Sequence, residues 1–115
     1  MKKWLLFAIC SLSYSAQAEF LTGNDVYQLY RAHLRADAPS PSNKDYADAM
    51  EYLGYVTGLW DAYDGLFICT NEPVTRGQIA DMVGSHLRDN PELRSKAASS
   101  TILVYLAEKY PCKKR

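Results

Sequence analysis

The sequence predicts an all-α domain, a compact bundle of four main helices stapled by one disulfide. Apolar residues recur three and four positions apart along most of the chain, and no segment of any length alternates apolar and polar residues as a strand would. Two of the three cysteines remain once an N-terminal leader is set aside, and an even number of cysteines favours a disulfide. The length of 115 residues allows one domain.

Residues 1–18 have the features of a secretory signal peptide. Lys2 and Lys3 give a positive start, residues 4–12 form a short apolar run, and residues 16–18 are an A-x-A cleavage site. A transmembrane helix is the weaker alternative because spanning a bilayer takes about 18–20 apolar residues. A lipid-modified Cys10 is weaker still, since it lacks the small residues expected before it. We expect cleavage after Ala18, export, and a mature domain of residues 19–115.

Removal of the leader changes the charge balance. The mature chain keeps all 13 acidic residues but only 11 of the 13 basic ones, so its net charge is −2. Three of those bases form a tail at residues 113–115, and the body without them carries −5. Free binding to nucleic acid normally needs a basic face. The composition therefore argues against a nucleic-acid partner.

Cys10 is lost with the leader, which leaves Cys69 and Cys112. In an exported protein such a pair is more often bridged than free. The bridge would close a loop of about 43 residues and stabilise the fold by on the order of 4 kcal/mol. A zinc site would need closer cysteine spacing, and a catalytic thiol would have to stay reduced in an oxidising compartment. The sequence therefore predicts a Cys69–Cys112 disulfide.

The first two helices are predicted from their ends and their apolar spacing. Helix one should begin at an Asn24 N-cap and end near Asp37, with its inner face on Val26, Leu29, Tyr30, His33 and Leu34. Helix two should begin at Ser42, with Asp45 in a capping-box position, and stop at Gly65.

Helix two carries two stripes. One is apolar and comprises Tyr46, Ala49, Met50, Leu53, Val56, Trp60 and Tyr63. The other holds small residues, Ala47, Gly54, Gly58, Ala62 and Gly65, and should admit another helix backbone. The acidic residues on this helix exclude a membrane span.

Helices three and four follow a structured connection at residues 66–74. Thr75 and Gln78 form a capping box, and the face of helix three should comprise Ile79, Met82, Val83, His86 and Leu87. Asn90 and Pro91 should end helix three and begin helix four, which stops at Pro111. The predicted faces of helix four are Leu93, Ala97, Thr101, Val104 and Ala107, widened by Ile102, Leu103, Leu106 and Tyr110.

Polar clusters offer little catalytic chemistry. His33 and His86 fall on or beside apolar stripes, which favours packed histidines over metal ligands. Seven acids lie between residues 36 and 72 against one base: Asp37, Asp45, Asp48, Glu51, Asp61, Asp64 and Glu72. The plainest interpretation is a solvated helix face, the sharper one a docking surface for a basic partner, and the weakest a pair of catalytic carboxylates. We expect no enzyme activity, no metal and no cofactor.

Tyrosines on helix two also bear on binding. Tyr52 and Tyr55 lie off the apolar stripe, so they either border the core with the hydroxyl in water or serve as exposed interface anchors.

From Tyr52 to Cys112 the chain resembles the Rap/Tai immunity proteins of type VI secretion systems. The residues that carry this resemblance are Leu53 to Gly58, Cys69, Pro73 to Thr75 with Gly77 and Gln78, Val83, Leu87, Asn90 to Arg94, Ala97 and Ala98, and Tyr110 to Cys112. The resemblance implies a small helical protein of the periplasm that neutralises an injected peptidoglycan amidase, in several cases as a homodimer. Leu53 stands where many relatives have a further cysteine, so a second disulfide is absent.

The sequence thus favours a periplasmic immunity protein whose partner is a secreted cell-wall amidase toxin. We expect the loop of residues 66–74, held by Cys69, to enter the toxin's cleft, with residues 89–92 as the other candidate. The candidate binding residues are Tyr55, Asp61, Tyr63, Asp64, Asn71, Glu72, Asp89 and Asn90. The alternatives are a periplasmic binding or stress module with another client, and a small cell-wall hydrolase that uses Asp61 or Asp64.

Overall fold

The computed structural model describes residues 20–113, so the expected cleavage site after Ala18 lies outside the described residues. Its elements are α1 (Gly23–Ala36), α2 (Asn43–Tyr63), α3 (Arg76–Asp89), the 3-10 turn η1 (Pro91–Leu93) and α4 (Ala98–Lys109). Within these residues only two isolated bridges have strand-like pairing. The predicted all-α class is confirmed.

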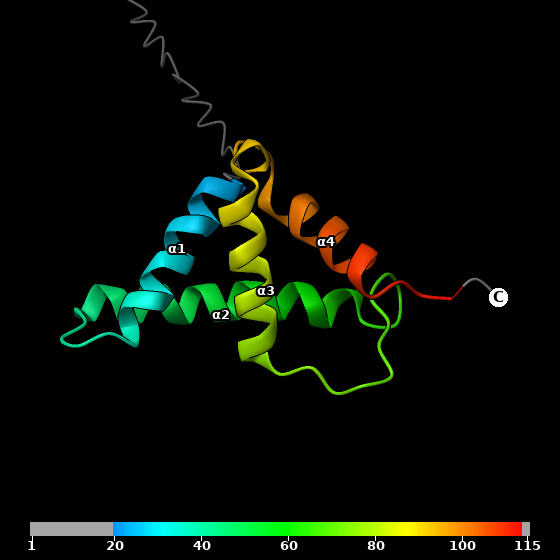
Figure 1. Ribbon diagram of the computed structural model, residues 1–115, viewed down its shortest axis with the longest axis horizontal. Helices are drawn as coiled ribbons and strands as arrows, with labels where there is room; N and C mark the ends of the chain where they lie inside the picture. Colours follow the sequence, from blue (N-terminus) through cyan, green and yellow to red (C-terminus); the bar gives the residue numbers. More distant parts are fainter. Residues whose placement is uncertain (1–19, 114–115) are drawn as a thin grey trace, which may run out of the picture.

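The helices form a tripod on a base (Figure 1). The start of α1, the end of α3 and the start of α4 meet at one end, which we call the apex and define as residues 21–24 and 89–98. From the apex the three helices diverge toward α2, which lies across the base. The connection between α2 and α3 therefore lies at the opposite end of α3 from the apex.

Local side-chain caps begin three of the helices. Ser42 with Asp45 and Thr75 with Gln78 form the two predicted capping boxes. A third box at α1 joins Thr22 to Asp25, so the predicted Asn24 N-cap is wrong by two residues. The backbone N–H of Thr22 donates to Asp25 and lowers the pKa of that carboxyl.

Backbone pairing holds the apex together. The N–H of Gly23 donates to the carbonyl of Lys96 at 2.9 Å, and the N–H of Ala98 donates to that of Leu21 at 2.9 Å. A Cβ on Gly23 would lie 2.6 Å from the Cα of Arg94, so only glycine allows the two backbones to come this close. The guanidinium of Arg94 stacks over the ring of Tyr27 at 4.3 Å.

This pairing corrects the prediction for the fourth helix. The chain makes only the 3-10 turn η1 after Asn90, and α4 begins at Ala98 instead of Pro91. Residues 94–97 do not join α4 because the carbonyls of Arg94 and Lys96 accept from the first N–H groups of α1, and the N–H of Ala98 donates to the carbonyl of Leu21 just before α1. The buried face of α4 is Ala98, Thr101, Ile102 and Leu106, whereas Val104, placed on the inner face by the sequence, is exposed.

The core contains a tyrosine that the sequence placed off the apolar stripe. Tyr52 is fully buried, and its hydroxyl donates to the carbonyl of Ala80 on α3. Its ring centre lies 5.6 Å from that of Tyr30, whose ring packs directly on Gly84. The prediction was wrong because α1 and the small residues of α3 together create room for both rings. Burial raises the pKa of Tyr52.

Other predicted apolar positions are exposed. Leu34 of α1 faces solvent, and so do Tyr46 and Met50, because α2 turns the row Ala49, Tyr52, Val56 and Trp60 toward the core. The core cluster comprises Val26, Tyr30, Tyr52, Val56, Trp60, Ile68, Ile79, Ala80, Val83, Leu87, Ala98, Ile102 and Leu106.

The small-residue stripe does not receive another helix. We call the face of Ala47, Met50, Gly54, Gly58, Asp61 and Ala62 the outer face of α2; all six residues are exposed. A Cβ placed on Gly54 or Gly58 would meet nothing within 4 Å. The predicted close packing is therefore wrong within the described chain. Gly65, with φ +78°, does end the helix as predicted.

Candidate partner-binding surface

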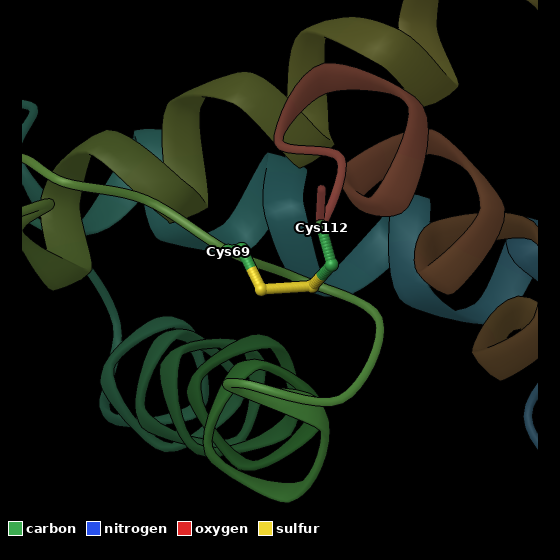
Figure 2. The surroundings of a disulfide bond; sticks show 2 residues. All are labelled: Cys69 and Cys112. Atoms are coloured by element: carbon green, nitrogen blue, oxygen red, sulfur yellow. A yellow bond between two sulfur atoms is a disulfide. The ribbon is translucent and has the colours of Figure 1, made fainter. Parts of the chain in front are cut away.

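The predicted disulfide joins the loop after α2 to the segment that follows the end of α4. Figure 2 shows the bridge between Cys69 and Cys112, which are 43 residues apart in the sequence. Beside it, the N–H of Cys69 donates to the carbonyl of Tyr110 at 2.9 Å. The loop is thus fixed to α4 by one covalent bond and one hydrogen bond.

A tight turn begins this loop. The carbonyl of Tyr63 accepts hydrogen bonds from the N–H groups of Leu66, Phe67 and Ile68, at 3.0, 3.0 and 3.2 Å. Ile68 is fully buried and anchors the turn in the core. Leu66 and Phe67 are left 66% and 56% exposed, and the ring centre of Phe67 lies 5.8 Å from that of Tyr63. The turn therefore presents two apolar side chains on a firm support.

Sequence reasoning placed the loop but did not single out Leu66 and Phe67. A signal was available in the apolar run of residues 66–68, which follows a helix stop at Gly65. In so short a turn the three side chains cannot all reach the core. The run did not indicate which one would be buried.

The second half of the loop is shaped by Thr70. Its hydroxyl accepts from the N–H of Glu72 at 3.1 Å and donates to the carbonyl of Glu72 at 2.9 Å. This turn leaves Asn71 and Glu72 exposed. Between the loop and α3 lies a shallow hollow of about 320 Å³, lined by Thr70, Glu72, Pro73, Val74, Gln78, Asp81, Met82 and Tyr110.

A groove follows the outer face of α2. It encloses about 270 Å³ and is lined by Met50, Leu53, Gly54, Thr57, Gly58, Asp61 and Arg76. The two glycines keep its floor open, and Met50 at its rim is 68% exposed. Asp61 and Arg76 add one charge of each sign. The groove offers an apolar contact with a polar border.

The structure gathers five of the predicted binding residues at the end of α2. Asp61, Tyr63 and Asp64 belong to the last turn and cap of α2, and Asn71 and Glu72 follow in the loop. Tyr55, two to three turns earlier on α2, is half-buried near Ser99, and burial raises its pKa.

Asp89 and Asn90 lie apart from this group. They stand at the apex, and the 14 residues of α3 separate them from the loop by about 20 Å. Both have local roles there. Asp89 pairs with Arg88 at 2.9 Å, which lowers the pKa of Asp89, and the Asn90 side chain donates to the carbonyl of His86 at 2.9 Å.

Charge pairing differs along α2. Near its start, Asp45 pairs with Arg35 at 3.0 Å and Asp48 with Lys44 at 2.6 Å. Across residues 20–113, no ion pair is formed by the four other acids of α2 and the loop, Glu51, Asp61, Asp64 and Glu72. Negative charge without partners therefore accumulates toward the end of α2. Such a field favours the approach of a cationic partner.

The histidines pack against tyrosines, as predicted. The ring of His86 stacks on Tyr105 with 4.0 Å between ring centres, and His33 lies 5.5 Å from the ring of Tyr52. Within the described part of the chain, no three His, Cys, Asp or Glu side chains come together as a metal site. None of the helices described there has the length and apolar character needed to cross a membrane.

The end of α2 and the loop after it thus combine two exposed apolar side chains with acids that form no ion pair among the described residues, a combination found on protein-binding surfaces. The family model of the Rap1a immunity proteins matches residues 22–112, and the chain belongs to that family. The resemblance found in the sequence is thereby confirmed. No curated protein gives a significant match. Family membership points to an immunity protein against secreted effectors and implies an effector protein as its partner.

Proposed function

We propose that this protein is a periplasmic immunity protein that binds a type VI secreted peptidoglycan amidase and blocks its active site. In this proposal residues 1–18 are removed on export and residues 19–115 form the working domain. The domain acts by occlusion, with no catalysis and no cofactor of its own.

The observation that carries the proposal is the stapled loop of residues 64–75. Its exposed Leu66 and Phe67 are held by the turn on the Tyr63 carbonyl before them, and by the buried Ile68 and the Cys69–Cys112 bridge after them. A surface that is already rigid loses little conformational entropy when it docks. Apolar and aromatic side chains at the centre of an interface supply most of its binding energy. The loop therefore suits insertion into a cleft.

The end of α2 supports the same proposal. Asp61 at the end of α2, and Asp64 and Glu72 in the loop itself, add exposed negative charge, which speeds encounter with a basic surface. The groove on the outer face of α2 offers a second, apolar contact beside it. The partner surface proposed here is thus the loop together with the end and outer face of α2.

An inhibition assay tests this function. The mature chain, residues 19–115, is titrated into the amidase encoded beside it while the release of peptidoglycan fragments is followed. We expect stoichiometric inhibition, and we expect Phe67→Ala to weaken binding about tenfold or more, as truncation of an interface anchor does.

Phe20→Ala is the matched control. Phe20 is 80% exposed and comes directly before the apex residues 21–24, whereas the loop follows α2 at the base (Figure 1). The control should inhibit as the unaltered protein does. An amidase that stays fully active in the presence of excess mature protein contradicts the proposal.

A further inference from the structure

The hollow between the loop and α3 differs in charge from its neighbours. Two carboxylates line it, Glu72 from the loop and Asp81 from α3, and its wall contains no Lys, Arg or His. Three other hollows on the described surface each include a basic side chain, namely Lys96, Arg76 and Lys113. The hollow beside the loop therefore carries negative charge that its own wall does not neutralise.

The fold does not pair either of these carboxylates. Glu72 and Asp81 are both exposed, and neither forms an ion pair with any residue between 20 and 113. Two like charges on one hollow also repel each other. Both carboxylates are thus available to a positive group from outside the chain.

The rest of the wall is largely apolar and includes an aromatic ring. Pro73, Val74 and Met82 line the hollow together with the half-buried Tyr110. An arginine side chain has a matching division, since its stem packs along apolar surface while its planar cation stays at the end. The guanidinium binds carboxylates through several N–H donors and stacks on tyrosine rings. The aromatic ring therefore points to a cation independently of the two carboxylates.

The size of the hollow suits one side chain. It encloses about 320 Å³, near the lower limit of the sites that hold small ligands, which enclose about 300–1,000 Å³. Four of its eight lining residues belong to the loop that we place in the effector's cleft. A side chain at the edge of that cleft can therefore reach the hollow when the loop docks.

Local contacts hold both sides of the hollow in place. The hydroxyl of Thr70 bonds both the N–H and the carbonyl of Glu72, at 3.1 and 2.9 Å. The hydroxyl of Tyr110 donates to Sδ of Met82 at 3.5 Å. The ring of Tyr110 also lies edge-on to that of Trp60, with 5.3 Å between ring centres. A wall that is formed before binding loses little conformational freedom when a ligand arrives.

We propose that this hollow receives the guanidinium of an arginine that the bound effector presents beside the loop. Glu72 and Asp81 accept hydrogen bonds from the guanidinium, and Met82 and Tyr110 pack against the arginine side chain. The inference rests on the proposed function and deepens it, because it names the chemistry of the effector surface that meets the loop. It also extends the partner surface from α2 and the loop to α3.

A small probe tests the hollow without an effector. Residues 19–115 are titrated with N-acetyl-arginine amide while nuclear magnetic resonance follows the backbone N–H signals. N-acetyl-citrulline amide, which has nearly the same shape but no charge, is the control probe. The arginine probe should shift the signals of residues 70–72 and 78–82 with a saturable, millimolar dissociation constant, and the citrulline probe should not. Asp81→Asn should abolish the shifts.

The same carboxylates should contribute to effector binding. Asp81→Asn and Glu72→Gln should each raise the dissociation constant for the amidase about tenfold, because the guanidinium loses a charged acceptor. Neither substitution should lower the melting temperature, since the fold pairs neither carboxylate. Glu108→Gln is the matched control. It removes the same charge from an exposed residue that lines a separate groove between α3 and α4, and it should bind as the unaltered protein does.

Two outcomes overturn the inference. Either the arginine probe shifts the signals beside the hollow no more than the citrulline probe does, or Asp81→Asn and Glu72→Gln bind the amidase as tightly as Glu108→Gln. Failure of the proposed function gives a different result. The unaltered protein would then leave the amidase fully active, while the arginine probe would still bind in the hollow.

Discussion

The two faces of α2 contrast sharply. The inner face buries Tyr52 and Val56 completely, while the outer face exposes Met50 and two glycines. Glycine in a helix interior costs about 1 kcal/mol relative to alanine, whichever face it occupies. On α3 this cost is offset by packing, because the missing side chain of Gly84 makes room for the ring of Tyr30. On the outer face of α2 no described atom uses the space.

Helical glycines that the fold requires can thus be distinguished from helical glycines that leave a surface open. Both kinds lie within a helix and have the same helical conformation. Only the surroundings of an added Cβ tell them apart. The open space above Gly54 and Gly58 is what we expect of a helix face that receives a partner from outside the chain.

The largest expected effect comes from the staple that holds the loop beside the end of α2. Replacing both cysteines, C69S with C112S, should lower the free energy of unfolding by on the order of 4 kcal/mol, because the unfolded chain regains its freedom. Urea denaturation measures this loss. The variant should also bind the effector more weakly, since the loop is no longer fixed to α4. Equal stability with and without the bridge would contradict the expectation.

Gly84→Ala tests the buried glycine of α3, which the fold uses. A Cβ at this position would lie 2.2 Å from ring atoms of Tyr30, and Tyr30 is buried and cannot swing away. Overpacking of this kind should cost about 2–3 kcal/mol of stability. Thermal unfolding followed by circular dichroism checks it. A variant as stable as the parent protein would show that the α1–α3 contact is looser than described.

Replacing glycine by alanine on the outer face of α2 should instead increase the stability of the fold. Gly54→Ala and Gly58→Ala should each raise the free energy of unfolding by up to about 1 kcal/mol, because alanine restores helix propensity and meets nothing within 4 Å. The same unfolding measurement applies to both. A loss of stability in either variant would mean that the glycine is needed by the fold after all.

The smallest effect concerns His86, which packs on Tyr105. Its partial burial lowers its pKa below the ordinary value. Protonation therefore favours the unfolded chain, and stability should decline as the pH falls below about 6.5, the ordinary pKa of histidine. His86→Gln removes the titrating group. The melting temperature of this variant should therefore change less between pH 7 and pH 5 than that of the parent protein. An equally steep decline in the variant would assign it to other groups.

Those contrasts also explain which parts of the fold the sequence predicts. The capping boxes at Ser42 and Thr75 and the stop at Gly65 depend on neighbours within three residues, and all three were predicted correctly. The disulfide was predictable as well, because setting aside Cys10 with the predicted leader leaves two cysteines, which can pair in only one way.

The errors share a different cause. The start of α4 depends on backbone pairing with residues more than seventy positions earlier. The burial of Tyr52 depends on small residues of another helix, and the open outer face of α2 depends on what α1, α3 and α4 leave uncovered. No local pattern contains that information. For the same reason the sequence indicated residues 66–74 and residues 89–92 as two candidate segments without showing that α3 holds them at opposite ends.

Gly58→Leu gives the most direct test of the partner surface. The added side chain fills the groove on the outer face of α2 without touching the core, so the variant should unfold at a temperature at or above that of the parent protein. Under the proposed function, calorimetric titration of the mature protein with any peptidoglycan amidase encoded beside it should show tight binding. The variant should bind about tenfold more weakly or worse, because the groove is blocked. Equal affinity of a folded Gly58→Leu variant would contradict the assignment of this face to the partner.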